Sequence, residues 1–157
     1  MRVGIGFDLH RFTEGRKLIL CGVEIPYEKG LFGHSDADVA LHALTDAILG
    51  AAGLPDIGTL FPDGDPRFQG MASHYFLKEA LRLIGEKGLR VYQVDLVLIL
   101  DRPRIAPYRE AMLANLSRWL EIPRDCVGLK AKTTEGLGFS GEEAVATWAT
   151  AVLRDGS

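Results

Sequence analysis

The chain has 157 residues, of which 47% are hydrophobic and 25% are charged, and its formal net charge is −3. This length and composition are typical of one globular domain with a full core. The negative charge argues against a general nucleic-acid or membrane-surface binder, which would carry a basic face. Cys21 and Cys126 form no paired motif, so neither a disulfide framework nor a cysteine zinc site is indicated. No apolar run approaches a membrane span, and we expect a soluble, cytoplasmic domain.

The first 25 residues predict two extended segments, over 2–12 and 17–25, with a glycine-containing turn between them. Asp8 and His10 are two residues apart in the first segment. Their side chains therefore leave the same face of a strand.

Residues 33–50 predict an amphipathic helix. Its apolar positions recur at helical spacing, at Ala40, Ala43, Leu44, Ala47, Ile48 and Ala51. Ser35 with Asp38 three residues later has the pattern of a capping box, which predicts Ser35 as the N-cap. Asp38, His42 and Asp46 follow a second line along the helix.

If the Asp8 face of the strand meets the His42 side of this helix, one carboxylate and two imidazoles converge. Three nitrogen and oxygen ligands with a fourth position open are the pattern of a catalytic zinc site. The alternative is that D-x-H pairs are common and that an isolated histidine is more often a core or surface residue.

His34 immediately precedes the expected helix start, where free amides and the helix dipole favour an anion such as phosphate. Alternatively, His34 only leads into a capped helix. The loop over 54–66 carries Asp56, Asp63 and Asp65, which could hold hydroxyls or a cation but lack EF-hand spacing. For Asp65 we favour ordinary turn chemistry.

Helices and strands alternate through the rest of the chain. A helix begins after a Ser73 cap and ends near Gly88. A central strand over 91–100 follows, with one face formed by Tyr92, Val94, Leu96, Leu98 and Leu100. A helix from Pro107 to Pro123 and a strand over 127–134 follow. The tail is ambiguous between a capping box that begins at Ser140 and a strand. This alternation predicts layered α/β structure.

Residues 130–139 combine lysines, threonines, Glu135 and glycines. Such a set suits a diphosphate, with Glu135 holding a bridging Mg²⁺, although no Walker motif is present. The alternative is a strand end with a solvated charged face.

Several of these motifs together resemble one family. The segments at 8–10, 33–46, 56–63 and 130–135 are similar, in order and spacing, to those of the 2-C-methyl-D-erythritol 2,4-cyclodiphosphate synthase family. The resemblance covers essentially the full chain. It implies one α+β domain over 1–157, a mixed four-stranded sheet with helices on one face, a strand at the tail, and a homotrimer with active sites between subunits.

The resemblance also implies the reaction. The 2-phosphate of 4-diphosphocytidyl-2-C-methyl-D-erythritol 2-phosphate would attack the β-phosphorus, giving the cyclodiphosphate and CMP in the non-mevalonate route to isoprenoids. Zn²⁺, or another divalent cation, would be bound by Asp8, His10 and His42. Mg²⁺ or Mn²⁺ would be held at the substrate diphosphate with Glu135.

By the same resemblance, His34 and Thr133 stabilise the transition state. Asp56 and Asp63 hold the methylerythritol hydroxyls, and the turn over 100–106 surrounds cytidine. The full set of implied substrate contacts is Asp8, His10, His34, Ser35, Asp56, Gly58, Phe61, Asp63, Leu100, Arg104, Ile105, Ala106, Ala131, Lys132, Thr133, Thr134, Glu135 and Phe139.

Two positions depart from the family pattern. Lys132 stands where threonine is frequent, and Glu142 lies in a region where many members carry an arginine that binds an isoprenoid diphosphate on the threefold axis. We therefore do not carry that ligand over. Two rival functions are a zinc-dependent phosphohydrolase that releases linear products and a non-catalytic trimeric nucleotide-binding module.

Overall fold

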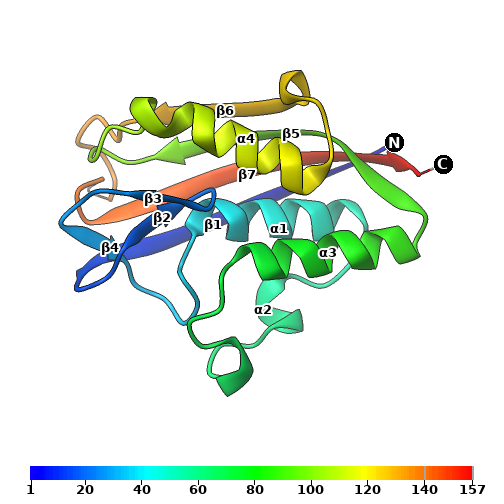
Figure 1. The fold of residues 1–157 in the computed structure, drawn as a ribbon, viewed down its shortest axis with the longest axis horizontal. Coiled ribbons are helices and arrows are strands. Elements are labelled where there is room, and N and C mark those ends of the chain that lie inside the picture. The colour runs from blue at the N-terminus through cyan, green and yellow to red at the C-terminus, as the bar shows by residue number, and fades with distance from the viewer. Residues whose placement is uncertain (140, 157) are drawn as a thin grey trace.

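The computed structural model describes residues 1–139 and 141–156, and its centre is one mixed sheet (Figure 1). The five strands follow the order β4-β1-β7-β5-β6. Their bounds are Arg2–Glu14 (β1), Lys29–Leu31 (β4), Leu89–Ile99 (β5), Val127–Lys132 (β6) and Ala144–Asp155 (β7). Only β5 and β6 pair in parallel. The mixed α+β architecture is confirmed, but the count of four strands is wrong because β4 has three residues, too few for a recognisable alternation.

The segment predicted as one strand over 17–25 is instead a hairpin of β2 (Leu18–Leu20) and β3 (Val23–Ile25), which form their own two-stranded sheet. The two residues between them, Cys21 and Gly22, both have positive φ, of 49° and 72°. Two central residues with positive φ make a tight turn whose twist suits a hairpin. A non-glycine residue rarely adopts this conformation, so the sequence pattern did not reveal it.

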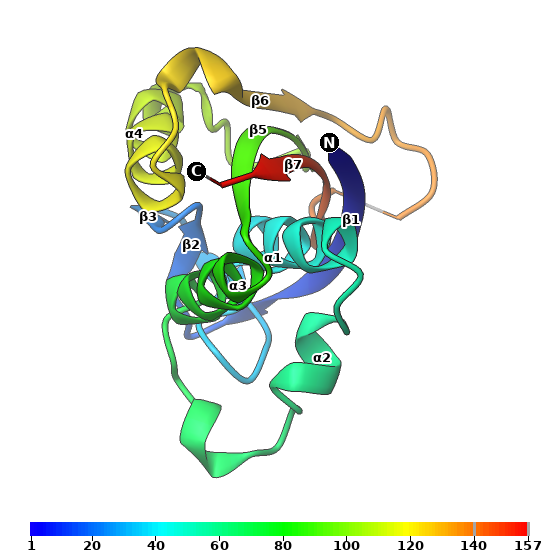
Figure 2. The ribbon, with the colours of Figure 1, turned by 90° about the vertical axis from the view of Figure 1, so that its right-hand side faces the viewer.

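The three long helices gather on one side of the sheet, as expected (Figure 2). They are α1 (Val39–Ala51), α3 (His74–Glu86) and α4 (Arg109–Leu120). Short helical segments occupy Ile57–Leu60 (α2), Pro66–Phe68 (η1), Ala106–Tyr108 (η2) and Arg124–Cys126 (η3). The largest fully buried side chains between helices and sheet include Leu41, Leu44, Ile48, Leu77, Ile84, Leu96 and Leu98.

Helix α1 lies directly against the backbone of β1 because two glycines face it. A Cβ atom on Gly4 would stand 2.0 Å from the Ala47 carbonyl oxygen, and one on Gly6 would stand 1.9 Å from that of Ala43. No side chain fits into such a gap. The alternating glycines of β1 and the alanines of α1 therefore set the separation of the two elements that carry Asp8, His10 and His42.

Helix α1 begins at Val39, later than predicted, and its N-cap is Asp38 rather than Ser35. The Asp38 carboxylate is fully buried and accepts hydrogen bonds from the Leu41, Cys21 and Gly22 amides at 3.2, 3.0 and 2.7 Å. Burial raises the pKa of the Asp38 carboxyl to about 7, although these hydrogen bonds act to lower it. One carboxylate thus caps α1 and fixes the β2–β3 turn, which a local capping pattern does not reveal.

Strand β5 is central, as predicted, between β7 and β6. The prediction that Tyr92 shares a face with Val94 is wrong, because the register of β5 with β7 shifts between Val91 and Gln93. This bulge reverses the alternation, so Val91 is buried and Tyr92 is exposed.

The tail forms strand β7, which bears out the resemblance and not the capping-box pattern, although Ser140 itself lies outside the described residues. The loop over 54–66 was expected to lack regular structure, yet Asp56 caps the one-turn helix α2 there. Within residues 1–139 and 141–156, no helix combines the length and apolar character that crossing a membrane requires.

The sheet face away from the helices is apolar and exposed. Val3 and Ile5 keep 66% and 64% of their surface accessible, and Phe7 and Trp148 keep 45% and 47%. The rings of Phe7 and Trp148 pack with centroids 4.6 Å apart. An apolar patch of this kind on a single chain marks a surface that another molecule covers.

Candidate active site

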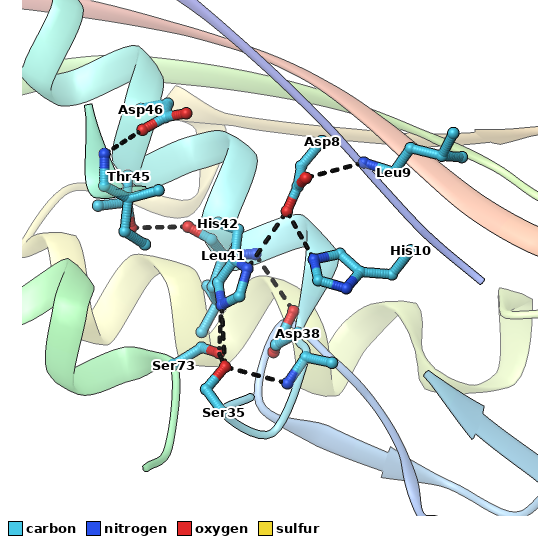
Figure 3. Close-up of polar contacts among 12 residues, drawn as sticks. Asp8, Leu9, His10, Ser35, Asp38, Leu41, His42, Thr45, Asp46 and Ser73 are labelled. Atoms are coloured by element: carbon cyan, nitrogen blue, oxygen red, sulfur yellow. Dashed lines mark hydrogen bonds and ion pairs between the residues drawn. The ribbon is translucent and has the colours of Figure 1, made fainter. Parts of the chain in front are cut away.

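Asp8, His10 and His42 meet where β1 crosses α1, and we call these three residues the ligand cluster (Figure 3). The Asp8 Oδ2 atom lies 2.9 Å from His10 Nε2 and 3.2 Å from His42 Nδ1. Their ligand atoms all lie within 4.8 Å of one another. The predicted convergence of these three side chains is confirmed.

The electrostatics of the cluster favour an ionised carboxylate. Burial acts to raise the pKa of Asp8, but hydrogen bonds from His10 and His42 outweigh it and hold that pKa well below its usual range. Burial likewise acts to lower the pKa of His10, and the hydrogen bond and charge of Asp8 outweigh it and raise that pKa. A positive charge is therefore stabilised at this point, whether it is a proton or a cation.

The donor set fits a divalent metal ion. His10 Nδ1 lies 2.7 Å from the Phe32 carbonyl oxygen, which can only accept a hydrogen bond, so Nδ1 carries a proton. A cation that displaced the proton shared by Nε2 and Asp8 would therefore meet the lone pair of Nε2. Ligands of a four-coordinate zinc ion lie about 3.3 Å apart. The Asp8 oxygen lies 2.9 and 3.2 Å from the two histidine nitrogens, which is close to that spacing.

The ligand cluster lines a cleft of about 280 Å³. Five other predicted site residues also line it: His34, Ser35, Gly58, Phe61 and Asp63. Asp56 does not, because its carboxylate accepts from the Thr59 amide at 2.9 Å as the cap of α2. Residues from β1, α1 and the segment around α2 therefore form one polar cleft with an aromatic wall.

His34 does not lie at the start of a helix, which corrects the anion site expected there. The first turn of α1 is closed by the buried Asp38 carboxylate. His34 Nε2 instead lies 3.2 Å from the Asp65 carbonyl oxygen. The Asp65 side chain caps η1 and pairs with Arg67 at 2.7 Å, in agreement with turn chemistry.

The other predicted contacts lie elsewhere on the chain. A second recess, of about 220 Å³, is lined by Leu100, Arg104, Ile105, Ala106, Ala131, Lys132 and Thr133. Beside it, Thr134 donates to Asp101 through its amide and hydroxyl, at 2.9 and 3.2 Å. Glu135 is exposed at a φ of 55°. Phe139 lines a third recess with Arg11 and Lys29.

Sequence reasoning missed three residues that hold the cleft in shape. Arg16 donates to the carbonyls of Gly33 and Ser35, on both sides of His34. Asp36 and Ser73 bond each other directly behind His42. No local pattern links residues this far apart in sequence. Asp46, which follows His42 on the second line of the helix, accepts from the Ile57 amide at 2.8 Å and anchors α2.

An Asp/His/His cluster that could hold a divalent metal ion, beside a small-molecule cleft, is typical of the class of metal-dependent enzymes. The profile of the YgbB family matches residues 1–154. The 2-C-methyl-D-erythritol 2,4-cyclodiphosphate synthase of Thermus thermophilus is 54% identical over 156 residues, covering 99% of this chain and all of the relative. That of Syntrophobacter fumaroxidans is 50% identical over 155 residues, 98% of each.

Solved structures agree with these sequence matches. A 2-C-methyl-D-erythritol 2,4-cyclodiphosphate synthase described as the CDP-bound form superposes with a TM-score of 0.91 at 50% identity, covering 98% of this chain and 100% of that one. The chain belongs to the YgbB family. It is a cyclodiphosphate synthase, an enzyme of the methylerythritol phosphate pathway.

Proposed function

We propose that residues 1–157 act as one domain that converts 4-diphosphocytidyl-2-C-methyl-D-erythritol 2-phosphate to 2-C-methyl-D-erythritol 2,4-cyclodiphosphate. An oxygen of the 2-phosphate forms a bond to the β-phosphorus, the bond from that phosphorus to the CMP oxygen breaks, and CMP leaves with the electron pair. The observation that carries this assignment is the ligand cluster, which opens onto a cleft large enough for the branched sugar phosphate.

The residues of the chain have separate tasks in this proposal. Asp8, His10 and His42 hold Zn²⁺ or another divalent cation, and Glu135 helps to hold Mg²⁺ or Mn²⁺. When bound, these cations neutralise the phosphate charges and act as Lewis acids. Asp63 and Asp56 accept hydrogen bonds from the sugar hydroxyls.

His34 and Thr133 donate to the phosphate oxygens as negative charge develops on them. An ionised phosphate needs no base to attack, so the enzyme acts mainly by placing two anionic groups in line. The second recess, around Arg104 and Lys132, takes the cytidine end of the substrate. A similar synthase structure, described as the CDP-bound form, supports a cytidine nucleotide site.

We also propose that the chain works as a homotrimer with active sites between subunits. The cleft at the ligand cluster and the recess at Lys132 share no lining residue, so one chain offers two separate parts of a substrate site. A neighbouring subunit that brings its own recess to this cleft completes the site. The exposed apolar face around Ile5 and Phe7 supplies a surface for such contacts.

Introducing a charge on this face should dissociate the assembly. Ile5→Asp keeps the fold, because the side chain is 64% exposed, but it buries a carboxylate in the assembled form. We expect monomers by size-exclusion chromatography with light scattering, and loss of activity. Ala114→Asp, at an exposed position of α4, is the matched control and should stay trimeric. A fully active Ile5→Asp monomer would refute shared active sites.

Product analysis separates this reaction from simple hydrolysis. Phosphorus NMR should show the two coupled resonances of a cyclic diphosphate together with an equal amount of CMP. A zinc phosphohydrolase would instead release linear phosphates, and a nucleotide-binding module would give no turnover. The first result supports the proposal and either of the others excludes it.

Two further features remain predictions. A cytoplasmic location and the lack of nucleic-acid or membrane partners agree with the net charge of −3. Glu142 pairs with Arg102 at 3.6 Å, and we propose no isoprenoid diphosphate site in its region.

A further inference from the structure

Behind His42, on the side away from Asp8, lies a buried polar chain (Figure 3). His42 Nε2 is 2.9 Å from the hydroxyl of Ser73, and that hydroxyl donates to the Asp36 carboxylate. Ser73 has no exposed surface. We propose that Ser73 and Asp36 are positioning residues that fix the tautomer and ring orientation of His42 for metal binding. This inference rests on the cation site of the proposed function.

The position of Ser73 makes its hydrogen bonds unusual. It is the N-cap residue of α3, where a serine side chain normally accepts from a backbone amide of the first turn. Here the side chain makes no capping bond. The sequence pattern correctly placed a helix start at Ser73, but its hydroxyl is directed toward His42 and Asp36 instead.

The direction of each hydrogen bond follows from what each group can donate. A carboxylate only accepts, and Asp36 accepts both the Ser73 hydroxyl and the Ser73 amide, the latter at 3.0 Å. The single hydroxyl proton of Ser73 is therefore used on Asp36. Only lone pairs of Ser73 face His42 Nε2, so the hydrogen bond between Ser73 and His42 requires a proton on Nε2. With Nε2 protonated, a cation bound beside Asp8 would meet the lone pair of His42 Nδ1 once Nδ1 has given up the proton that it shares with Asp8.

Both carboxylate oxygens of Asp36 accept hydrogen bonds. It also accepts from the Asp38 amide at 3.1 Å, and its own amide donates to the Met71 carbonyl at 3.1 Å. The chain of bonds thus joins the start of α1 to the start of α3. The Ser35 hydroxyl lies 3.2 Å from His42 Nε2 in a residue that is 5% exposed, and it has a lone pair for the same proton when Ser73 accepts it.

The hydrogen bonding of His42 parallels that of His10, whose Nδ1–H donates to the Phe32 carbonyl oxygen. Each imidazole has one nitrogen bonded to a fixed acceptor and the other directed at Asp8 Oδ2. Partners that orient a ligand in this way usually contribute about 10- to 100-fold in metal affinity.

The test measures zinc affinity by competition with a chromophoric chelator. We expect Ser73→Ala to weaken zinc binding about 10- to 100-fold and Asp36→Asn to weaken it about tenfold. Ser117→Ala, which removes a hydroxyl that donates to the Ile122 carbonyl on α4, should match the wild type. Asp46→Asn, which removes a carboxylate near the cluster but not in this chain of bonds, should change affinity less than about threefold.

Nitrogen-15 NMR of the wild-type histidine rings gives a readout that does not depend on any variant folding. In metal-free protein, His42 Nε2 should carry a proton that is hydrogen-bonded to Ser73, and Ser73→Ala should shift the Nε2 resonance and speed the exchange of this proton with water. A wild-type His42 without a proton on Nε2 overturns the inference, as does unchanged zinc affinity in both variants. A wild type that binds no divalent cation overturns the proposed metal site instead, so the two failures are distinct.

Discussion

His42→Ala should lower kcat/KM about 10³-fold or more. The variant removes one of three ligand side chains, and a metal ion that stabilises transition-state charge contributes several kcal/mol. The measurement is CMP release at saturating Mg²⁺, together with zinc content. The protein should remain folded, because the His42 ring is only partly buried at the cleft.

The matched control for this prediction is His74→Ala. His74 is also a histidine on a helix, but it is exposed and stacks on Trp119, with centroids 5.4 Å apart. It should keep wild-type turnover and zinc content. If His42→Ala turned over substrate at the wild-type rate, the metal role of the ligand cluster would be wrong.

Gly6→Ala should be the most damaging single-methyl change in β1. Its Cβ atom would stand 1.9 Å from the Ala43 carbonyl oxygen, so α1 has to move away from the strand. We expect a loss of about 3 kcal/mol in the free energy of unfolding, at the upper end for overpacking. Because α1 carries His42 and β1 carries Asp8, zinc affinity should fall as well.

Gly85→Ala is the matched control for the backbone change. Gly85 lies on α3 with no atom within 4 Å of an added Cβ. Alanine is the better helix former, so this variant should gain up to about 1 kcal/mol. Urea unfolding measures both variants. Wild-type stability and zinc affinity in Gly6→Ala would show that the strand and helix are not held in contact in this way.

Much of the fold follows from patterns that one segment carries by itself. The alanine-rich stripe of α1 and the apolar run of β5 predicted their elements because each is long and regular. The errors fall where a distant residue decides local structure. Asp38 displaces Ser35 as the cap because it also binds the turn at Cys21. The bulge in β5 arises from its register with β7, which lies far along the chain.

The candidate site was likewise predictable where the signal lies within one segment, and unpredictable where it depends on residues far apart in the sequence. D-x-H spacing correctly placed Asp8 and His10 on one face, and helical spacing correctly isolated His42. The close contact of Gly6 with Ala43 brings the three ligand side chains together. In the sequence, this contact could have been predicted from the alternating glycines of one segment and the alanine stripe of the other. Ser73 and Asp36 could not be linked from sequence, because 37 residues separate them.

The central claim is that turnover depends on one metal ion bound by Asp8, His10 and His42. The most direct test titrates zinc into chelator-treated protein with Mg²⁺ present and follows CMP release. We predict no release at the start, then a linear rise that ends at about one zinc per chain. Full turnover by the metal-free protein, or a rise unrelated to zinc occupancy, would contradict this account.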